Sequence, residues 1–193
     1  VGCDVTGFDI NPMSYWIVKQ EIEHLNLDAY TKAAESLRTT MEKEIGQFYR
    51  TRCTLCNSND AHVKYFLWVK VTPCHQCGKD IDLFPGYLLS ADSRHPKNVF
   101  ICPCCGELTE TGDRKEPGHC NQCATELPLK GPAKRSRCRC SACGADNHYP
   151  DAGLGAPRHR LFAMEYHCSR CKPSHTGRFF KKPDDHDLEN VNE

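Results

Sequence analysis

Six CxxC motifs lie within 119 residues of the chain, and they constrain its fold more than any other feature. Each motif brings two thiolates close together on a tight turn, and two such turns supply the tetrahedral sulfur ligands of a structural zinc ion. We therefore predict three zinc sites. Their ligands are Cys53, Cys56, Cys74, Cys77, Cys102, Cys105, Cys120, Cys123, Cys140, Cys143, Cys168 and Cys171.

The order of the motifs predicts how they pair. Taken in sequence, partner motifs are separated by 17, 14 and 24 residues, and the first interval is typical of a zinc ribbon. Sequential pairing closes the shortest loops and so loses the least chain entropy. Three tandem ribbons are the simplest interpretation, although six motifs can pair in fifteen ways and a crossed arrangement stays open.

A disulfide framework is the alternative use of so many cysteines. Fifteen is an odd number, no signal peptide opens the chain, and CxxC spacing favours metal, so we predict a reducing, cytoplasmic setting and no membrane partner. Cys3, Cys104 and Cys138 remain, and free thiols are expected there. His75 and His119 flank motifs but are expected to be exposed loop residues because each site already has four thiols.

Composition limits the apolar core. The 193 residues include 39% hydrophobic residues, with a mean hydropathy of −0.62, so metal must replace missing apolar burial in the cysteine-rich part. The formal net charge is +0, from 25 basic and 25 acidic residues. Bulk charge therefore gives no reason to expect nucleic-acid binding, and any phosphate contact needs a local basic cluster.

Residues 1–50 contain one cysteine, and their sequence predicts a strand followed by two helices. Asp4–Ile10 is rich in strand formers, and Asn11 followed by Pro12 predicts a helix from Pro12 to about Glu23. A second helix, with Asp28 as its cap, carries apolar residues every three or four positions up to Phe48.

The rest of the chain divides into three parts. Residues 51–127 hold the first two ribbons and a strand over His62–Val71. Residues 128–172 hold a basic linker and the third ribbon, with a strand over Arg158–His167. Residues 173–193 form a return segment, in which Asp184 caps a final helix.

The segment Gly2–Pro12 resembles the second strand of class I S-adenosylmethionine-dependent methyltransferases, in the form found in amino-directed DNA methylases. The order of four later stretches is similar to a family of prokaryotic adenine-specific DNA methylases that carry a large cysteine-rich insertion. These stretches are Phe48–Cys53, Trp68–Lys70, Cys77–Lys79 and Arg160–Tyr166. The resemblance implies an α+β chain: a partial α/β methyltransferase unit followed by three tandem zinc ribbons of short β-hairpins.

The family implies a function and two cofactor contacts. The parent enzyme would transfer methyl from S-adenosylmethionine to an exocyclic amino group of a base swung out of duplex DNA. Asp9 corresponds to the residue that binds the ribose hydroxyls of the cofactor, and Ile10 would pack on its adenine. The alternative is that Asp9 simply caps the turn before Pro12.

The chain lacks two family motifs. No stretch resembles the glycine-rich cofactor loop, and the catalytic Asp/Asn-Pro-Pro-Tyr/Phe motif is missing. We therefore expect an internal fragment that neither binds S-adenosylmethionine tightly nor transfers methyl, and we predict no catalytic residue within it. Sequence does not set the oligomeric state.

The basic residues Lys134, Arg135, Arg137 and Arg139 have two interpretations. They either contact the phosphate backbone of DNA or form a solvated linker whose charge offsets nearby thiolates. The linker is favoured because only Tyr149 is aromatic near the run and no base-reading helix is evident. A free-standing zinc-ribbon module that binds nucleic acid or protein without catalysis is the alternative to the enzyme, and a rubredoxin-like iron protein is a third.

Overall fold

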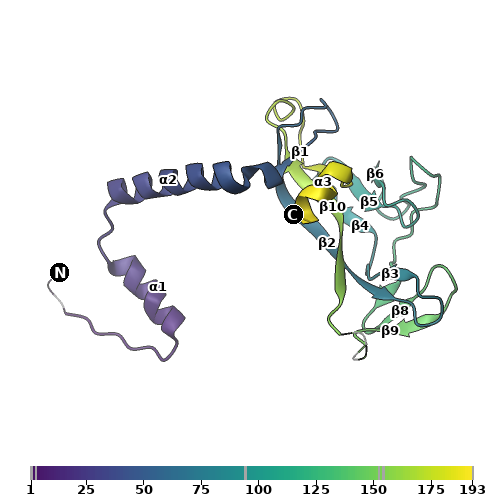
Figure 1. The fold of residues 1–193 in the computed structure, drawn as a ribbon, viewed down its shortest axis with the longest axis horizontal. Helices are drawn as coiled ribbons and strands as arrows, with labels where there is room; N and C mark the ends of the chain where they lie inside the picture. Colours follow the sequence, from purple (N-terminus) through teal and green to yellow (C-terminus); the bar gives the residue numbers. More distant parts are fainter. Residues whose placement is uncertain (1, 3, 94, 152, 154, 193) are drawn as a thin grey trace. The chain divides into compact units, whose positions relative to one another are not determined.

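The computed structural model describes the chain except residues 1, 3, 94, 152, 154 and 193. It divides into two compact units, Val1–Gln47 and Phe48–Glu193, and each is described by itself (Figure 1). No helix in the described part of the chain combines the length and the apolar character that spanning a bilayer requires.

The first unit contains two α-helices, α1 (Pro12–Ile22) and α2 (Leu27–Ile45). The predicted start of α1 is confirmed, because the Asn11 side chain accepts a hydrogen bond from the Met13 N–H and Pro12 is the first helical residue. The cap of α2 is Asn26 rather than Asp28. Asn26 accepts a hydrogen bond from the Ala29 N–H, and Asp28 lies in the first turn.

The predicted strand over Asp4–Ile10 does not form. These residues have no regular secondary structure, and Val5, Phe8 and Ile10 are 89%, 94% and 103% exposed. A strand needs a neighbouring strand for its backbone hydrogen bonds, and none lies beside this segment in the described part of the chain. Strand-forming residues alone are therefore insufficient here.

The second unit is built from antiparallel strands and one α-helix. After a short 3-10 turn, η1 (Gly46–Tyr49), the strands are β1 (Arg50–Thr51), β2 (Ala61–Pro73), β3 (Asp80–Asp82), β4 (Leu88–Ser90), β5 (Asn98–Ile101), β6 (Leu108–Thr111), β7 (Ala133–Lys134), β8 (Arg137–Arg139), β9 (Asp146–His148), β10 (Arg158–His167) and β11 (Phe179–Lys181). The helix α3 (Asp185–Asn192) follows.

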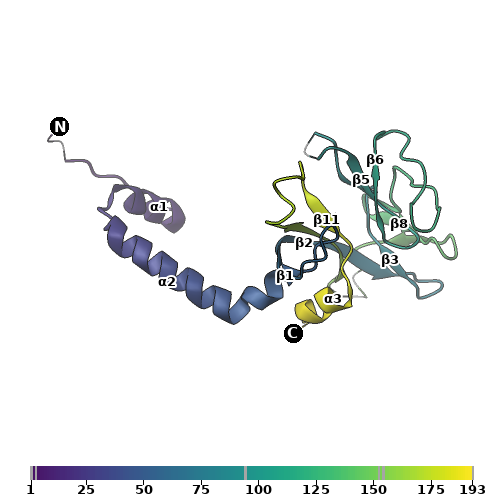
Figure 2. The ribbon, with the colours of Figure 1, turned by 90° about the horizontal axis from the view of Figure 1, so that it is seen from above.

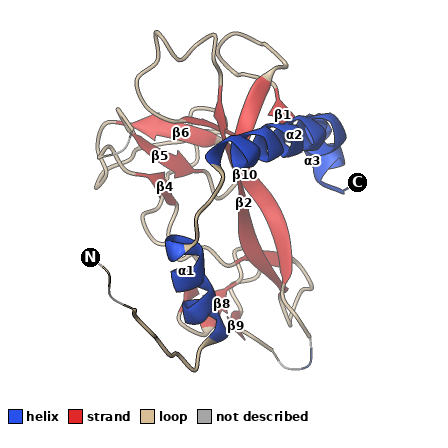
Figure 3. Ribbon diagram, turned by 90° about the vertical axis from the view of Figure 1, so that its left-hand side faces the viewer, coloured by secondary structure: helices blue, strands red, loops and turns tan. Residues whose placement is uncertain are grey.

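The long strands β2 and β10 form the central antiparallel ladder of the unit. Nine residue pairs align them antiparallel, from Arg158 opposite Val71 to His167 opposite His62, and Figure 3 shows the two strands side by side along their length. The sheet has the order β1-β2-β10-β11, and β3 also pairs with β2. Both long strands were predicted, and β10 has the predicted limits.

Two smaller sheets accompany this ladder. Strands β4, β5 and β6 form one, and β7, β8 and β9 form the other. Leu127–Arg137, predicted as an exposed linker, contains β7 and the first residue of β8, so the basic run lies in a β-hairpin. Ala133 of β7 and Cys138 of β8 are buried on one face of the hairpin, whereas the residues next to them face solvent. This alternation is typical of strands with one buried face.

The buried side chains form several small clusters instead of one large core. Three of them include CxxC cysteines, as where Cys53 and Cys168 pack with Tyr166 and Phe179. A fourth joins Val69 and Val71 of β2 to the second sheet. This arrangement agrees with the expectation that metal binding supplements a modest apolar core.

Candidate metal centre

The twelve CxxC cysteines converge into three groups of four. The groups are Cys53, Cys56, Cys168 and Cys171; Cys74, Cys77, Cys140 and Cys143; and Cys102, Cys105, Cys120 and Cys123. Within each group, all four sulfur atoms lie within 4.8 Å of one another. The twelve predicted cysteines therefore form three groups, each with four sulfur atoms close enough to bind one metal ion.

The sulfur–sulfur distances match a tetrahedral metal site. Cys53 and Cys171 are 3.8 Å apart, Cys74 and Cys143 are 3.6 Å apart, and Cys102 and Cys123 are 3.5 Å apart. A zinc ion with Zn–S bonds of about 2.3 Å places its sulfur ligands about 3.8 Å apart. The donor set and its spacing thus fit zinc. Four thiolates also complete its coordination, so such a site is structural and has no open position for a substrate.

The pairing of the motifs is nested, which corrects the tandem arrangement predicted above. Only the central pair, Cys102/Cys105 with Cys120/Cys123, joins consecutive motifs. The reason is the β2–β10 ladder. Antiparallel strands place the residues before the first strand beside those after the second, so the motif at Cys53 meets the motif at Cys168.

The same ladder explains the second site, at its opposite end. The motif at Cys74 follows β2 directly and meets the motif at Cys140, which lies ahead of β10. The thirteen residues of β2 span about 40 Å, so the two sites stabilise opposite ends of one sheet. The third site joins the β5–β6 hairpin to the loop that follows it.

Backbone conformation fixes each CxxC turn. In the motif at Cys74, the Gly78 N–H donates to the Cys74 carbonyl at 2.8 Å. Gly78 has a φ of 72°, a left-handed conformation that glycine adopts without steric cost. Ala124 occupies the corresponding position of the motif at Cys120 with a φ of 58°, where its Cβ makes this conformation unfavourable.

Hydrogen bonds prepare the sulfurs for metal binding. Burial opposes ionisation of Cys53, but backbone N–H groups of Cys56 and Leu55 and the Tyr166 hydroxyl outweigh it and lower the Cys53 pKa to about 6. The pKa of Cys171 is raised to about 12, chiefly by its hydrogen bond with Cys56. A metal ion that binds this group therefore displaces protons from the remaining thiols.

Each site also has a polar side chain beside a sulfur. The Tyr166 hydroxyl donates to Cys53 Sγ at 3.7 Å, Asn147 Nδ2 donates to Cys74 Sγ at 3.6 Å, and Thr125 Oγ1 lies 3.2 Å from Cys123 Sγ. Such contacts orient metal ligands and adjust their charge. Sequence reasoning missed these three residues, because nothing in the spacing of Tyr, Asn or Thr distinguishes them from their neighbours.

The remaining cysteines and histidines lie outside the three groups. Cys104 is exposed and Cys138 is buried, both as free thiols, as predicted. Burial raises the pKa of Cys138. His75 binds the Asn147 side chain through its ring Nδ1 at 2.9 Å instead of joining a metal group. Cys3 lies outside the described residues.

The two predicted cofactor residues are exposed in the first unit. Asp9 Oδ1 accepts a hydrogen bond from the Asn11 N–H at 2.7 Å, so Asp9 does cap the turn before Pro12. The Ile10 side chain is fully exposed, so no described residue covers the surface that would pack on the adenine ring.

A fourth group of possible ligands, Asp184, His186 and Asp187, serves a different purpose. Lys181 Nζ lies 2.6 Å from Asp184 Oδ2 and 2.7 Å from Asp187 Oδ2, so its ammonium already neutralises the carboxylates. Asp184 also accepts a hydrogen bond from the Asp187 N–H, which confirms it as the cap of α3. Both carboxylates of this group therefore belong to an ion-pair network.

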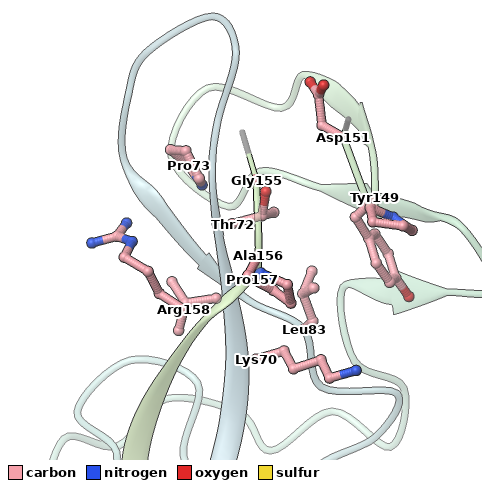
Figure 4. Close-up of a pocket in the computed structure, with 12 residues that line it drawn as sticks. Lys70, Thr72, Pro73, Leu83, Tyr149, Asp151, Gly155, Ala156, Pro157 and Arg158 are labelled. Carbon is pink, nitrogen blue, oxygen red and sulfur yellow. The ribbon is translucent and has the colours of Figure 1, made fainter. Parts of the chain in front are cut away.

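One cavity lies at the end of the ladder that carries the second cysteine group (Figure 4). It encloses about 420 Å³ and is lined by Lys70, Thr72, Leu83 and Tyr149, among others. Its lining is mainly apolar, and Arg158 at its edge is paired with Asp80. Its described lining residues provide no nucleophile with an adjacent base, so this cavity gives no indication of catalysis.

Comparisons of the chain with protein-family models, with curated proteins and with solved structures find no match.

Proposed function

We propose that the chain is the zinc-stabilised internal part of an adenine-specific DNA methyltransferase. In this proposal, residues 48–193 form a module inserted into the methyltransferase domain, and three four-thiolate zinc ions maintain its fold. The sequence resemblance to cysteine-rich adenine methylases suggests the enzyme. The observation that carries the proposal is that β1 and α3, far apart in the sequence of the second unit, are hydrogen-bonded to each other.

A hydrogen-bonded network, buried except at Asp184, joins β1 to α3. We call it the Lys181 network, and it consists of Thr51, Lys181, Asp184 and Asp187. The Thr51 hydroxyl donates to Asp187 Oδ1 at 2.6 Å, and Lys181 Nζ donates to Thr51 Oγ1 at 3.0 Å. Thr51 belongs to β1 and Asp187 to α3, which lie beside each other in Figure 2.

Adjacent ends are what an insertion requires. A module whose first and last elements meet can enter a loop of another domain without separating the two sides of that loop. The Lys181–Asp187 ion pair lies within the C-terminal segment, and the Thr51 hydroxyl of β1 hydrogen-bonds to both of its members. The contact between β1 and α3 is therefore compatible with an inserted module.

The first unit supports a second part of the proposal. Tyr30, Leu37 and Met41 of α2 are 59%, 60% and 47% exposed, and they repeat at spacings that place them on one side of the helix. Helices of an open α/β sheet turn such a stripe toward the sheet. We propose that α1 and α2 pack on the sheet of the host methyltransferase domain.

Asp9 and Ile10 would then contact the cofactor in the complete enzyme. The exposed Asp9 carboxylate offers only acceptors, which suits the two ribose hydroxyls. When bound, S-adenosylmethionine supplies the methyl group on a good leaving group, so this chain has to contribute placement more than acid–base chemistry. Zinc remains outside the reaction because its coordination is complete.

Methyl transfer by the complete protein tests this proposal. The protein expressed from the complete gene that encodes this chain should transfer labelled methyl from S-adenosylmethionine to adenine in duplex DNA. Asp9→Ala should weaken cofactor binding, while the chain alone should show neither binding nor transfer. A zinc-loaded complete protein that transfers no methyl would refute the enzyme and leave the free-standing module. Transfer by the chain alone would refute its role as an internal part.

A further inference from the structure

The β7–β8–β9 sheet carries the predicted basic run on one exposed face. Lys134 is aligned with Arg137, and Arg137 is aligned with His148, so these three form a row across the sheet. Arg139 follows on the same face, two residues along β8. The opposite face is buried through Ala133, Cys138 and Asn147.

The structure divides the basic residues into two kinds. Arg139 Nε donates to the Gly144 carbonyl at 3.2 Å, so Arg139 is bound to the CxxC turn of its own zinc group. Lys134, Arg135 and Arg137 are exposed, and no ion pair engages them within the described residues.

This lack of partners contrasts with the neighbouring arginines of the same unit. Arg158 pairs with Asp80, Arg160 with Asp82 and Arg178 with Glu165. Carboxylates thus balance those arginines locally, whereas three cations on one hairpin are left for another ligand. Their arrangement is set by strand pairing and not by a flexible linker.

The second zinc group does not account for these charges. A zinc ion with four thiolates carries a net charge of −2, and Arg139 lies against its CxxC turn. Arg137 lies three residues before Cys140, or about 10 Å along an extended strand. Because the side chains of Lys134, Arg135 and Arg137 are exposed, salt screens their attraction to the metal group.

We propose that the exposed face of the β7–β8–β9 sheet binds the phosphate backbone of duplex DNA through Lys134, Arg135 and Arg137. Strand spacing places neighbouring cations about 5 Å apart across the sheet, which lets them contact several phosphates. Contacts to phosphate carry no base information, so we expect binding that is independent of base sequence. The inference rests on the proposed function, for which it supplies the DNA-holding surface.

The composition of the hairpin favours nucleic acid over an anionic membrane. Ser136 lies between the cations, and Asp146 and His148 occupy the adjacent strand, so the exposed face carries no apolar anchor. Peripheral membrane binding normally combines basic residues with inserted apolar side chains or a lipid chain. Phosphate-backbone contact needs only the cations.

The test uses the zinc-loaded chain and a short fluorescein-labelled DNA duplex, with anisotropy measured between about 50 and 200 mM salt. The variant Lys134→Glu/Arg137→Glu is compared with Arg114→Glu/Lys115→Glu, which makes the same change in net charge on the exposed loop after β6. Zinc content and circular dichroism establish that both variants fold.

Loss of two phosphate contacts should flatten the plot of log affinity against log salt by about 2. The affinity ratio between the native chain and the hairpin variant should therefore change about tenfold across this salt range. The loop variant should keep the native slope. Equal effects of both variants, an unchanged slope in the hairpin variant, or no DNA binding by the native chain would overturn the inference.

Two further outcomes separate the inference from its premise. Binding to phosphatidylserine vesicles without binding to DNA would overturn the inference in favour of a membrane contact. DNA binding that depends on the hairpin, in a complete protein that transfers no methyl, would support the surface and refute the methyltransferase.

Discussion

Replacing Lys181 with methionine tests whether the Lys181 network closes the second unit. The Lys181 side chain is 5% exposed and that of Asp187 is 2% exposed, with 2.7 Å between Nζ and Oδ2. Removal of the ammonium leaves the Asp187 carboxylate buried without its ionic partner. Breaking a buried pair in this way costs about 3–5 kcal/mol. The thioether chain of methionine fills most of the vacated volume, so the loss reports charge more than packing.

The assay is urea unfolding of the zinc-loaded protein, with the midpoint and slope measured for each variant. Lys97→Met is the matched control, because Lys97 forms an exposed pair with Glu110 at 3.7 Å. Exposed pairs contribute about 0–1 kcal/mol, so this control should remain near the native midpoint.

A double variant separates the ion pair from its surroundings. In Lys181→Met/Asp187→Leu no buried unpaired charge remains, and Asp184, whose side chain is 46% exposed, keeps a hydrated carboxylate, so the protein should recover much of the stability lost in Lys181→Met. The reasoning is refuted if Lys181→Met costs no more than Lys97→Met, or if the double variant is less stable by the full sum of both single losses.

Further predictions concern the cysteine groups. Zinc removal by a chelator should abolish the β-sheet circular dichroism of the second unit, because the apolar clusters are small; an unchanged spectrum would contradict this. Cys168→Ser/Cys171→Ser should reduce the zinc content from three ions to two and expose Cys53 to alkylation, while Cys140 stays protected. The control Cys104→Ser should change neither the zinc content nor the alkylation of Cys53. Ala124→Gly should raise stability by up to about 1 kcal/mol through relief of its left-handed conformation, measured by urea unfolding, and a loss would count against that strain.

Local signals in the sequence predicted much of the secondary structure. Asn11 and Pro12 predicted the start of α1, Asp184 the start of α3, and a strand-like segment that leads into Cys168 the limits of β10, because each depends on residues near one another in the chain. The CxxC spacing likewise identified all twelve cysteines that form the three groups. The predicted strand over Asp4–Ile10 was wrong because a strand needs a hydrogen-bonding partner, and local composition does not reveal whether one is present.

The pairing of the CxxC motifs depended on long-range structure and could not be read from spacing. Cys56 and Cys168 are 112 residues apart, whereas Cys74 follows Cys56 by 18 residues. By the loop-closure relation the longer loop costs only about 1.6 kcal/mol more. The nine-residue-pair ladder between β2 and β10 outweighs this difference, and its register is set by side-chain packing that no single segment contains.

Cadmium substitution tests the nested pairing most directly. In the protein loaded with ¹¹³Cd, proton–cadmium correlations connect the β-protons of each cysteine to the metal that it binds. The structure predicts that Cys53 and Cys168 correlate with one cadmium and that Cys74 and Cys140 correlate with another. A single cadmium shared by Cys53 and Cys74 would contradict the nested arrangement and the β2–β10 ladder on which it depends.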